Sequence, residues 1–317
     1  MTGPPLIVLG VRRSGTTLLR VVLDRHSQLA IPDESYFVPQ LAGRHGDGID
    51  VDAFVDDLRR LPTLRDWNVS VEDVRARLQP GIPLGQAIAA VYEQYAADRG
   101  KSRWGDKTPM YMQHLPLLER LFPDALYVHL IRDGRDAAVS FLGMPEGIVT
   151  KTWAHPTTAA DFASEWRTQV KAAQQLGRRA GSGRYLELRY EAFVADPAAE
   201  LERICSFAAL AFEPAMLDYV GNTDVSAKPH QRSLERPPTP GLRDWRNEFG
   251  PEDVAAFEDV AGDLLGELGY ELSGDGRATL SARARRLAYR GRVAAWLTAS
   301  AALRRSPAWK RRHPPLA

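Results

Sequence analysis

The sequence predicts an α/β fold, a doubly wound parallel sheet with a P-loop-like core, a helical insertion and a helical C-terminal tail. Short apolar runs at residues 6–9, 125–131 and 185–191 read as strands, and segments of helical periodicity separate them. A glycine-containing turn follows the first run and opens into a helix. The 317 residues are 44% hydrophobic and include seven Trp, enough for a large core.

The elements follow in order along the chain. Residues 6–9 predict the first strand, about 15–25 the first helix, and 26–31 a short second strand. Residues 35–100 predict a mostly helical insertion, interrupted near Pro80 and Pro83.

The second half continues the alternation. Residues 104–111 have a high turn content and predict a loop that opens a helix near Met112. The strand at 125–131 leads into a helix through residues 137–140, and 159–180 form a helix with Trp166 in the core. A strand at 185–191 and a helix at 197–210 complete the pattern.

Charge divides the chain into a domain at 1–276 and a basic helical extension at 277–317. The net charge is +1, but from Arg277 onward there are 11 basic residues and no acidic ones. A helix at about 279–303 is expected. It either packs on the domain with a solvated basic face or contacts an anionic membrane as a peripheral element.

Composition also limits the chemistry. The single cysteine, Cys205, excludes an internal disulfide, and the seven histidines are scattered, so no metal site is expected. No signal-like or membrane-spanning apolar segment is visible, which predicts a cytoplasmic location. We expect no nucleic-acid partner.

The turn after the first strand predicts a phosphate-binding cradle. Backbone N–H groups at a helix start point towards an anion, and the helix dipole favours it. The spacing from Gly10 to Gly15 is that of a P-loop, but Thr16 occupies the position where P-loop NTPases carry Lys. The cations here are Arg12 and Arg13, which argues against ATP or GTP.

The stretch Arg13-Ser14-Gly15-Thr16-Thr17-Leu18 resembles the 5′-phosphosulfate loop of sulfotransferases that use 3′-phosphoadenosine 5′-phosphosulfate (PAPS). The variant with Arg before Ser-Gly-Thr-Thr is similar to tyrosylprotein sulfotransferases and bacterial relatives. The resemblance implies PAPS as co-substrate, 3′-phosphoadenosine 5′-phosphate (PAP) as product, and no metal. It assigns the nucleotide to these loop residues: Arg12, Arg13, Ser14, Gly15, Thr16 and Thr17.

Two later stretches resemble other nucleotide contacts of the family. Arg132 ends a buried strand and Ser140 follows eight residues later, as in the 3′-phosphate motif. The structural alternative is a helix cap in which Asp133 and Asp136 balance two arginines. Tyr190, in Arg-Tyr-Glu, matches a tyrosine near the adenine; alternatively, it is a core residue of an ordinary strand.

The resemblance also implies catalytic residues. Glu34 lies 21 residues after Arg13, the separation found in tyrosylprotein sulfotransferases, and is expected to be the general base. Its alternative is a cap for a helix starting near Ser35, a role open to Asp33 as well. Lys107, in Gly-Asp-Lys-Thr-Pro, matches an active-site lysine and is otherwise a solvated surface residue.

A late basic loop is expected to cover the nucleotide. Residues 228–249 contain two arginine-rich stretches around a proline run, but they lack the Arg-Lys-Gly signature of cytosolic sulfotransferases. Ser233 is a candidate catalytic residue, and Arg243 is a candidate nucleotide contact.

Together these features predict a PAPS-dependent sulfotransferase that transfers SO₃ to an acceptor hydroxyl, with an amine as the second choice. The acceptor is a small molecule, lipid, sugar or peptide. Arg13, Lys107 and the loop amides would stabilise charge on the leaving oxygen. Two alternatives stay open: a P-loop kinase or NTPase with Mg²⁺ on Thr17 and Asp133 in a Walker-B role, and a catalytically silent nucleotide-binding protein.

Overall fold

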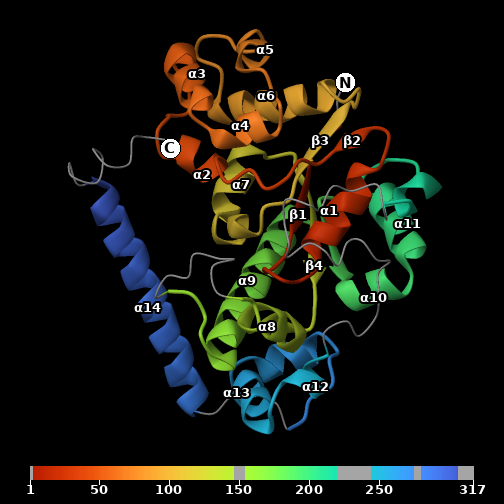
Figure 1. Cartoon of the computed structure of the whole chain (residues 1–317), viewed down its shortest axis with the longest axis vertical. Helices are drawn as coiled ribbons and strands as arrows, with labels where there is room; N and C mark the ends of the chain where they lie inside the picture. The colour runs from red at the N-terminus through yellow and green to blue at the C-terminus, as the bar shows by residue number, and fades with distance from the viewer. Residues whose placement is uncertain (1–2, 146–153, 220–243, 275–279, 306–317) are drawn as a thin grey trace.

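A five-stranded parallel sheet forms the centre of the computed structural model, which describes residues 3–145, 154–219, 244–274 and 280–305 (Figure 1). The strand order is β2-β3-β1-β4-β5. The strands are β1 (Leu6–Leu9), β2 (Leu29–Ala30), β3 (Arg103–Asp106), β4 (Leu126–Ile131) and β5 (Tyr185–Arg189). All pairs are parallel, which confirms the predicted α/β fold.

Helices cover both faces of this sheet. They are α1 (Thr16–Asp24), α2 (Val38–Ala42), α3 (Val51–Arg59), α4 (Pro62–Asp66), α5 (Val71–Arg75), α6 (Leu84–Ala97), α7 (Leu115–Leu121), α8 (Gly134–Leu142), α9 (Ala159–Ala180), α10 (Tyr190–Ala195), α11 (Pro197–Phe207), α12 (Trp245–Glu248), α13 (Pro251–Glu267) and α14 (Leu280–Arg305). Two 3₁₀ helices, η1 (Pro109–Gln113) and η2 (Pro214–Leu217), join them.

Strand β1 shows why the sheet carries helices on two sides. Leu6 and Val8 pack into one core together with side chains of α1 and α11. Ile7 and Leu9 point the other way, into the core shared with α6 and α9. Since successive side chains of a strand alternate between faces, an apolar run of this kind needs cover on both.

One prediction, that residues 104–111 form a loop, is wrong in part because residues 103–106 form strand β3. The stretch from Trp104 to Tyr111 was expected to be a loop, but it begins inside β3, which lies between β2 and β1. The expected helix near Met112 is η1, and α7 starts only at Leu115. The strand was not evident because polar Arg103 and Asp106 end it; Arg103 is buried and donates to the carbonyls of Pro4 at 2.6 Å and Ala208 at 2.5 Å.

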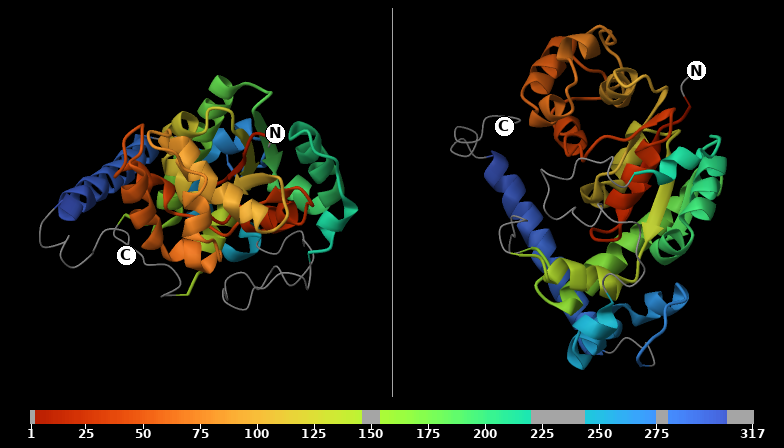
Figure 2. Two further views of the ribbon diagram at one scale, coloured as in Figure 1. Left: turned by 90° about the horizontal axis from the view of Figure 1, so that it is seen from above. Right: turned by 45° about the vertical axis from the view of Figure 1, so that its right-hand side comes forward.

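The predicted insertion consists of α2 to α6 and lies at one end of the molecule, opposite α12 and α13 (Figures 1 and 2). Its apolar side chains, among them Phe54, Leu58 and Trp67, join the core on the α6 side of the sheet. The predicted C-terminal helix is α14, which runs along α9 and α13. Within the described ranges, no helix is both long and apolar enough to cross a membrane.

Candidate active site

The loop between β1 and α1 has the backbone of an anion cradle. Arg13 and Gly15 have φ of 69° and 88°, and Gly15 is the N-cap of α1 without a side-chain hydrogen bond. Positive φ at two positions of a short turn can direct backbone N–H groups to one side, where the helix dipole also favours negative charge. The Ser14 hydroxyl is buried, and among the described residues it has no hydrogen-bond partner. A buried donor in this position fits a phosphate or sulfate oxygen.

Tyr190 lies directly against this loop. A Cβ atom added to Gly15 would stand 2.3 Å from Cε2 of Tyr190, so no side chain fits between them. The Arg132 guanidinium lies over the same ring, 4.7 Å from its centroid. Tyr190 is the first residue of α10 and packs on the loop, so it does not belong to a strand as the second alternative expected. Its place near the adenine stays a prediction.

The two predicted phosphate motifs meet in space. Nε of Arg13 donates to Oγ of Ser140 on α8 at 3.0 Å, although 127 residues separate them. Arg132 donates to the carbonyl of Arg13 at 3.3 Å and lies 3.6 Å from Asp136. Because β1 and β4 are parallel neighbours, the residues after both strands reach the same edge of the sheet.

The structure also contains the helix cap that was the structural alternative for the second motif. Asp133 caps α8 by accepting from the N–H of Arg135 at 2.9 Å, and its other oxygen pairs with that guanidinium at 2.7 Å. Both oxygens of Asp133 therefore face Arg135, which leaves the carboxylate poorly placed for a Walker-B role.

Glu34 and Lys107 form an ion pair beside the start of α1. Nζ of Lys107 lies 2.6 Å from Oε1 of Glu34 and 3.2 Å from Oγ1 of Thr17. Lys107 is not a solvated surface lysine, since its side chain is only 2% exposed. Burial lowers the pKa of Lys107, and the charge of Glu34 opposes that shift.

Glu34 does not cap a helix. Helix α2 starts at Val38, its N-cap is Phe37, and no side chain caps it. Oε2 of Glu34 instead accepts a hydrogen bond from the Tyr36 hydroxyl. Tyr36 is exposed and has a φ of 55°, a left-handed conformation that is uncommon for a large residue. Sequence reasoning missed Tyr36, which only its place two residues after Glu34 could have suggested.

A buried network fixes the residues on both sides of this ion pair. Oδ2 of Asp106 accepts from Ser35 at 2.8 Å, from Tyr92 at 2.9 Å and from Thr108 at 3.2 Å. The Ser35 hydroxyl also lies 2.6 Å from that of Tyr111. Burial raises the pKa of Asp106 to about 6, although these hydrogen bonds and Lys107 oppose it. Since Ser35 follows Glu34 and Asp106 precedes Lys107, the network holds both catalytic candidates in register.

Asp33 has a different role from the predicted cap. Its carboxylate lies 3.1 Å from Arg20 of α1, and the same guanidinium donates to the carbonyl of Ile31 at 3.3 Å. These contacts tie the segment before Glu34 to the helix that follows the cradle.

Arg12 contacts helices α8 and α9. Its Nε lies 2.7 Å from Oε1 of Glu165 on α9, and its guanidinium lies 5.1 Å from the centroid of Phe141. Trp166, next to Glu165, is fully buried, as predicted, and donates to the carbonyl of Arg132 at 3.2 Å. Helix α9 thus supports both arginine-bearing segments. The predicted nucleotide contact of Arg12 stays a prediction.

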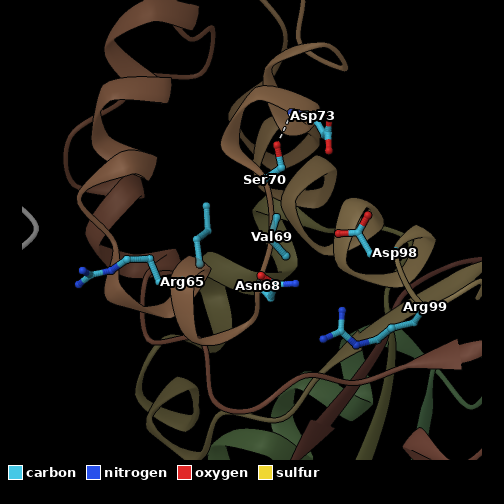
Figure 3. Close-up of a pocket in the computed structure, with 8 residues that line it drawn as sticks. Arg65, Asn68, Val69, Ser70, Asp73, Asp98 and Arg99 are labelled. Atoms are coloured by element: carbon cyan, nitrogen blue, oxygen red, sulfur yellow. Dashed lines mark hydrogen bonds between the residues drawn. The ribbon is translucent and has the colours of Figure 1, made fainter.

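Two candidate residues lie outside the described residues: Ser233 and Arg243. Within the described ranges, no group of three or more His, Cys, Asp or Glu residues could hold a metal. A hollow of about 820 Å³ lies on the insertion, around residues such as Arg65, Asn68 and Arg99 (Figure 3). None of its lining residues is a candidate site residue.

The chain belongs to the Sulfotransferase family. The sequence model of this family matches residues 4–214, which contain the cradle, Glu34, Lys107, Arg132, Ser140 and Tyr190. The protein is therefore a sulfotransferase enzyme, and this assignment decides against the kinase alternative.

Individual relatives agree with the family. Protein-tyrosine sulfotransferase A of Caenorhabditis elegans is 26% identical over 282 residues, covering 85% of this chain and 68% of that protein. Nodulation protein NoeE of Sinorhizobium fredii (strain NBRC 101917 / NGR234) is 29% identical over 300 residues, covering 85% and 67%. The solved sulfotransferase domain from the Synechococcus PCC 7002 olefin synthase superposes with a TM-score of 0.61 at 27% identity, over 85% of this chain and 95% of that one.

Proposed function

We propose that the protein transfers a sulfuryl group from PAPS to an acceptor hydroxyl, with Glu34 as the general base. The observation that carries this proposal is the contact between Glu34 and Lys107 beside Thr17, at the start of the helix that opens the anion cradle. A base, a buried cation and a phosphate-binding loop at one edge of the sheet are the groups that such a transfer needs.

The cradle fits the phosphosulfate end of the nucleotide. The loop amides after Arg13 and the buried Ser14 hydroxyl would donate hydrogen bonds to its oxygens. Arg132 and Ser140, which meet Arg13 across the sheet edge, would bind the 3′-phosphate. Tyr190, which lies between the cradle and Arg132, is in reach of both ends of this site.

Bound PAPS would supply the sulfuryl group and a phosphate leaving group. Glu34 takes the proton of the acceptor hydroxyl as the acceptor oxygen bonds to sulfur, while the bond between sulfur and the 5′-phosphate oxygen breaks and PAP leaves with that oxygen. Each carboxylate oxygen of Glu34 has a lone pair beyond those used by Lys107 and Tyr36. Lys107 and Arg13 would stabilise the negative charge that develops on the leaving oxygen, the task that Mg²⁺ performs in P-loop kinases. The buried network around Asp106 keeps these groups preorganised.

We further propose that the acceptor is a hydroxyl compound. A phenol is supported by the name of the Caenorhabditis elegans relative, a protein-tyrosine sulfotransferase. The identity of about 26% over 282 residues does not select a peptide over a sugar or lipid.

The test is transfer of labelled sulfate from PAPS to a panel of phenols, alcohols, sugars and amines, with EDTA and with Mg²⁺. We expect label on a hydroxyl acceptor, with EDTA without effect. Thermal unfolding with PAP is measured in parallel, because a ligand that binds only the folded state raises Tm. Stabilisation by PAP without transfer to any acceptor would instead identify a silent binding protein. A strict Mg²⁺ requirement, or no response to PAP, would refute the proposal.

A further inference from the structure

A basic groove lies between α9 and α14, away from the candidate active site. Its volume is about 540 Å³. Five cationic side chains line it: Arg167 and Lys171 of α9, and Arg283, Arg286 and Arg290 of α14. The groove contains no carboxylate among its lining residues.

The two sides of this groove differ in how their charges are balanced. Arg167 pairs with Asp263, and Lys171 lies 3.0 Å from Glu267, both on α13. By contrast, the three α14 arginines that line the groove form no ion pair within the part of the chain that the structure describes, whereas Arg285 and Arg292 do. Burial, and next the charge of Arg167, lower the pKa of Arg286, while the charges of Asp263 and Asp259 oppose this shift. An anion in the groove would relieve this crowding of like charges.

The face of α14 next to the groove is apolar and exposed. Leu280 and Leu287 are 82% and 68% exposed, and their spacing of seven residues puts them on one side of the helix. Arg283 and Arg290 border the same side. The opposite side anchors the helix to α9: Tyr289 donates to Glu165 at 2.8 Å, and Arg292 donates to Asp161 at 2.6 Å.

Helix α14 runs along the outside of the molecule, with one side towards α9 and the other towards solvent (Figures 1 and 2). Large apolar side chains that remain exposed next to arginines are typical of helices that lie in a membrane interface. A soluble anion would account for the arginines but would leave the leucines without a partner.

We propose that α14 and the groove beside it bind an anionic lipid surface. Phosphate headgroups would occupy the groove at Arg283, Arg286 and Arg290, and Leu280 and Leu287 would enter the acyl boundary. The inference does not depend on the proposed sulfuryl transfer, because no residue of the groove is part of the candidate active site.

The test uses the full chain and sedimentation with phosphatidylcholine vesicles, with and without about 30% phosphatidylserine. We expect binding that requires phosphatidylserine and falls as salt rises, because the attraction is screened within a Debye length. Each of Arg283→Gln, Arg286→Gln and Arg290→Gln should weaken binding about fivefold, the scale of one basic residue at an anionic surface. Leu287→Gln should weaken it without any change in charge.

Arg285→Gln is the matched control. Arg285 lies on the same helix and is also exposed, but it does not line the groove and lies 4.0 Å from Asp259. It should bind vesicles like the unmodified chain. An equal loss in Arg285→Gln and Arg286→Gln would mean unspecific charge attraction and would overturn the proposal.

Two further outcomes would also overturn it. The full chain could stay in the supernatant with anionic vesicles. Alternatively, inorganic phosphate could raise Tm through Arg286 while vesicles fail to pellet the protein, which would make the groove a site for a soluble anion. The Tm of every variant is measured without ligand, so that loss of folding is recognised.

Discussion

The ammonium group of Lys107 lies 2.6 Å from Oε1 of Glu34, although 73 residues separate them in the chain. Strands β2 and β3 are parallel neighbours, with Ala30 opposite Trp104. Glu34 lies four residues after Ala30, and Lys107 lies three residues after Trp104. Both residues therefore leave the sheet at the carboxyl ends of these two strands. The register of one short strand pair therefore brings the proposed base to the buried cation.

Glu34→Gln should reduce turnover about a hundredfold or more while leaving the fold intact, because the amide keeps the shape of the side chain but cannot take a proton. Turnover is measured with a hydroxyl acceptor, and PAP binding by its effect on Tm. Asp33→Asn is the control, since it removes the neighbouring carboxylate, which contacts Arg20 instead. Asp33→Asn should reduce turnover clearly less than Glu34→Gln. Near-normal turnover in Glu34→Gln would show that Glu34 is not the general base.

Asp106 should make stability depend on pH. Its pKa rises from 3.8 in the unfolded chain to about 6 in the folded one, because burial disfavours the charged form. The folded state therefore binds the proton of Asp106 more tightly than the unfolded chain does. The free energy of unfolding that this adds is fully present below about pH 4 and is lost as pH rises through about 6. The loss is roughly 3 kcal/mol for a pKa shift of about two units. The measurement is urea unfolding of the unmodified protein and of Asp106→Asn at pH 4.5 and pH 7. The unmodified protein should lose stability relative to Asp106→Asn as pH rises. A difference independent of pH would contradict this.

Arg132→Ala should reduce the rise in Tm caused by PAP more than the rise caused by AMP, which lacks the 3′-phosphate. The guanidinium lies next to Arg13 and Tyr190, where the 3′-phosphate is proposed to bind. Ser140→Ala should act in the same direction but more weakly, since it removes a neutral partner of Arg13. The readout is Tm with each nucleotide. Equal losses with PAP and AMP would exclude a role in 3′-phosphate binding.

Gly15→Ala should destabilise the protein by about 2–4 kcal/mol and abolish the PAP effect on Tm. The residue has a φ of 88°, and the added methyl group would meet the Tyr190 ring. Gly100→Ala separates the two causes, because its φ is 66° but an added Cβ meets nothing within 4 Å. It should cost only about 1 kcal/mol, the backbone strain alone. Equal effects in the two variants would exclude the contact with Tyr190 as the cause.

Local patterns along the chain were sufficient to predict several elements of the fold. Apolar runs with glycine turns identified β1, β4 and the cradle, and helical periodicity gave α9 its observed bounds, Ala159–Ala180. The resemblance to sulfotransferase motifs also named Glu34, Lys107, Arg132 and Ser140, whose roles stay predictions.

The contacts between these residues became apparent only in the folded chain. The strand β3 was read as a loop because its polar ends, Arg103 and Asp106, are satisfied by partners remote in the chain. The orientation of Arg12 towards Glu165 and the packing of Tyr190 on Gly15 also join distant segments. Such contacts depend on sheet register and helix packing, which side-chain periodicity along one segment does not encode.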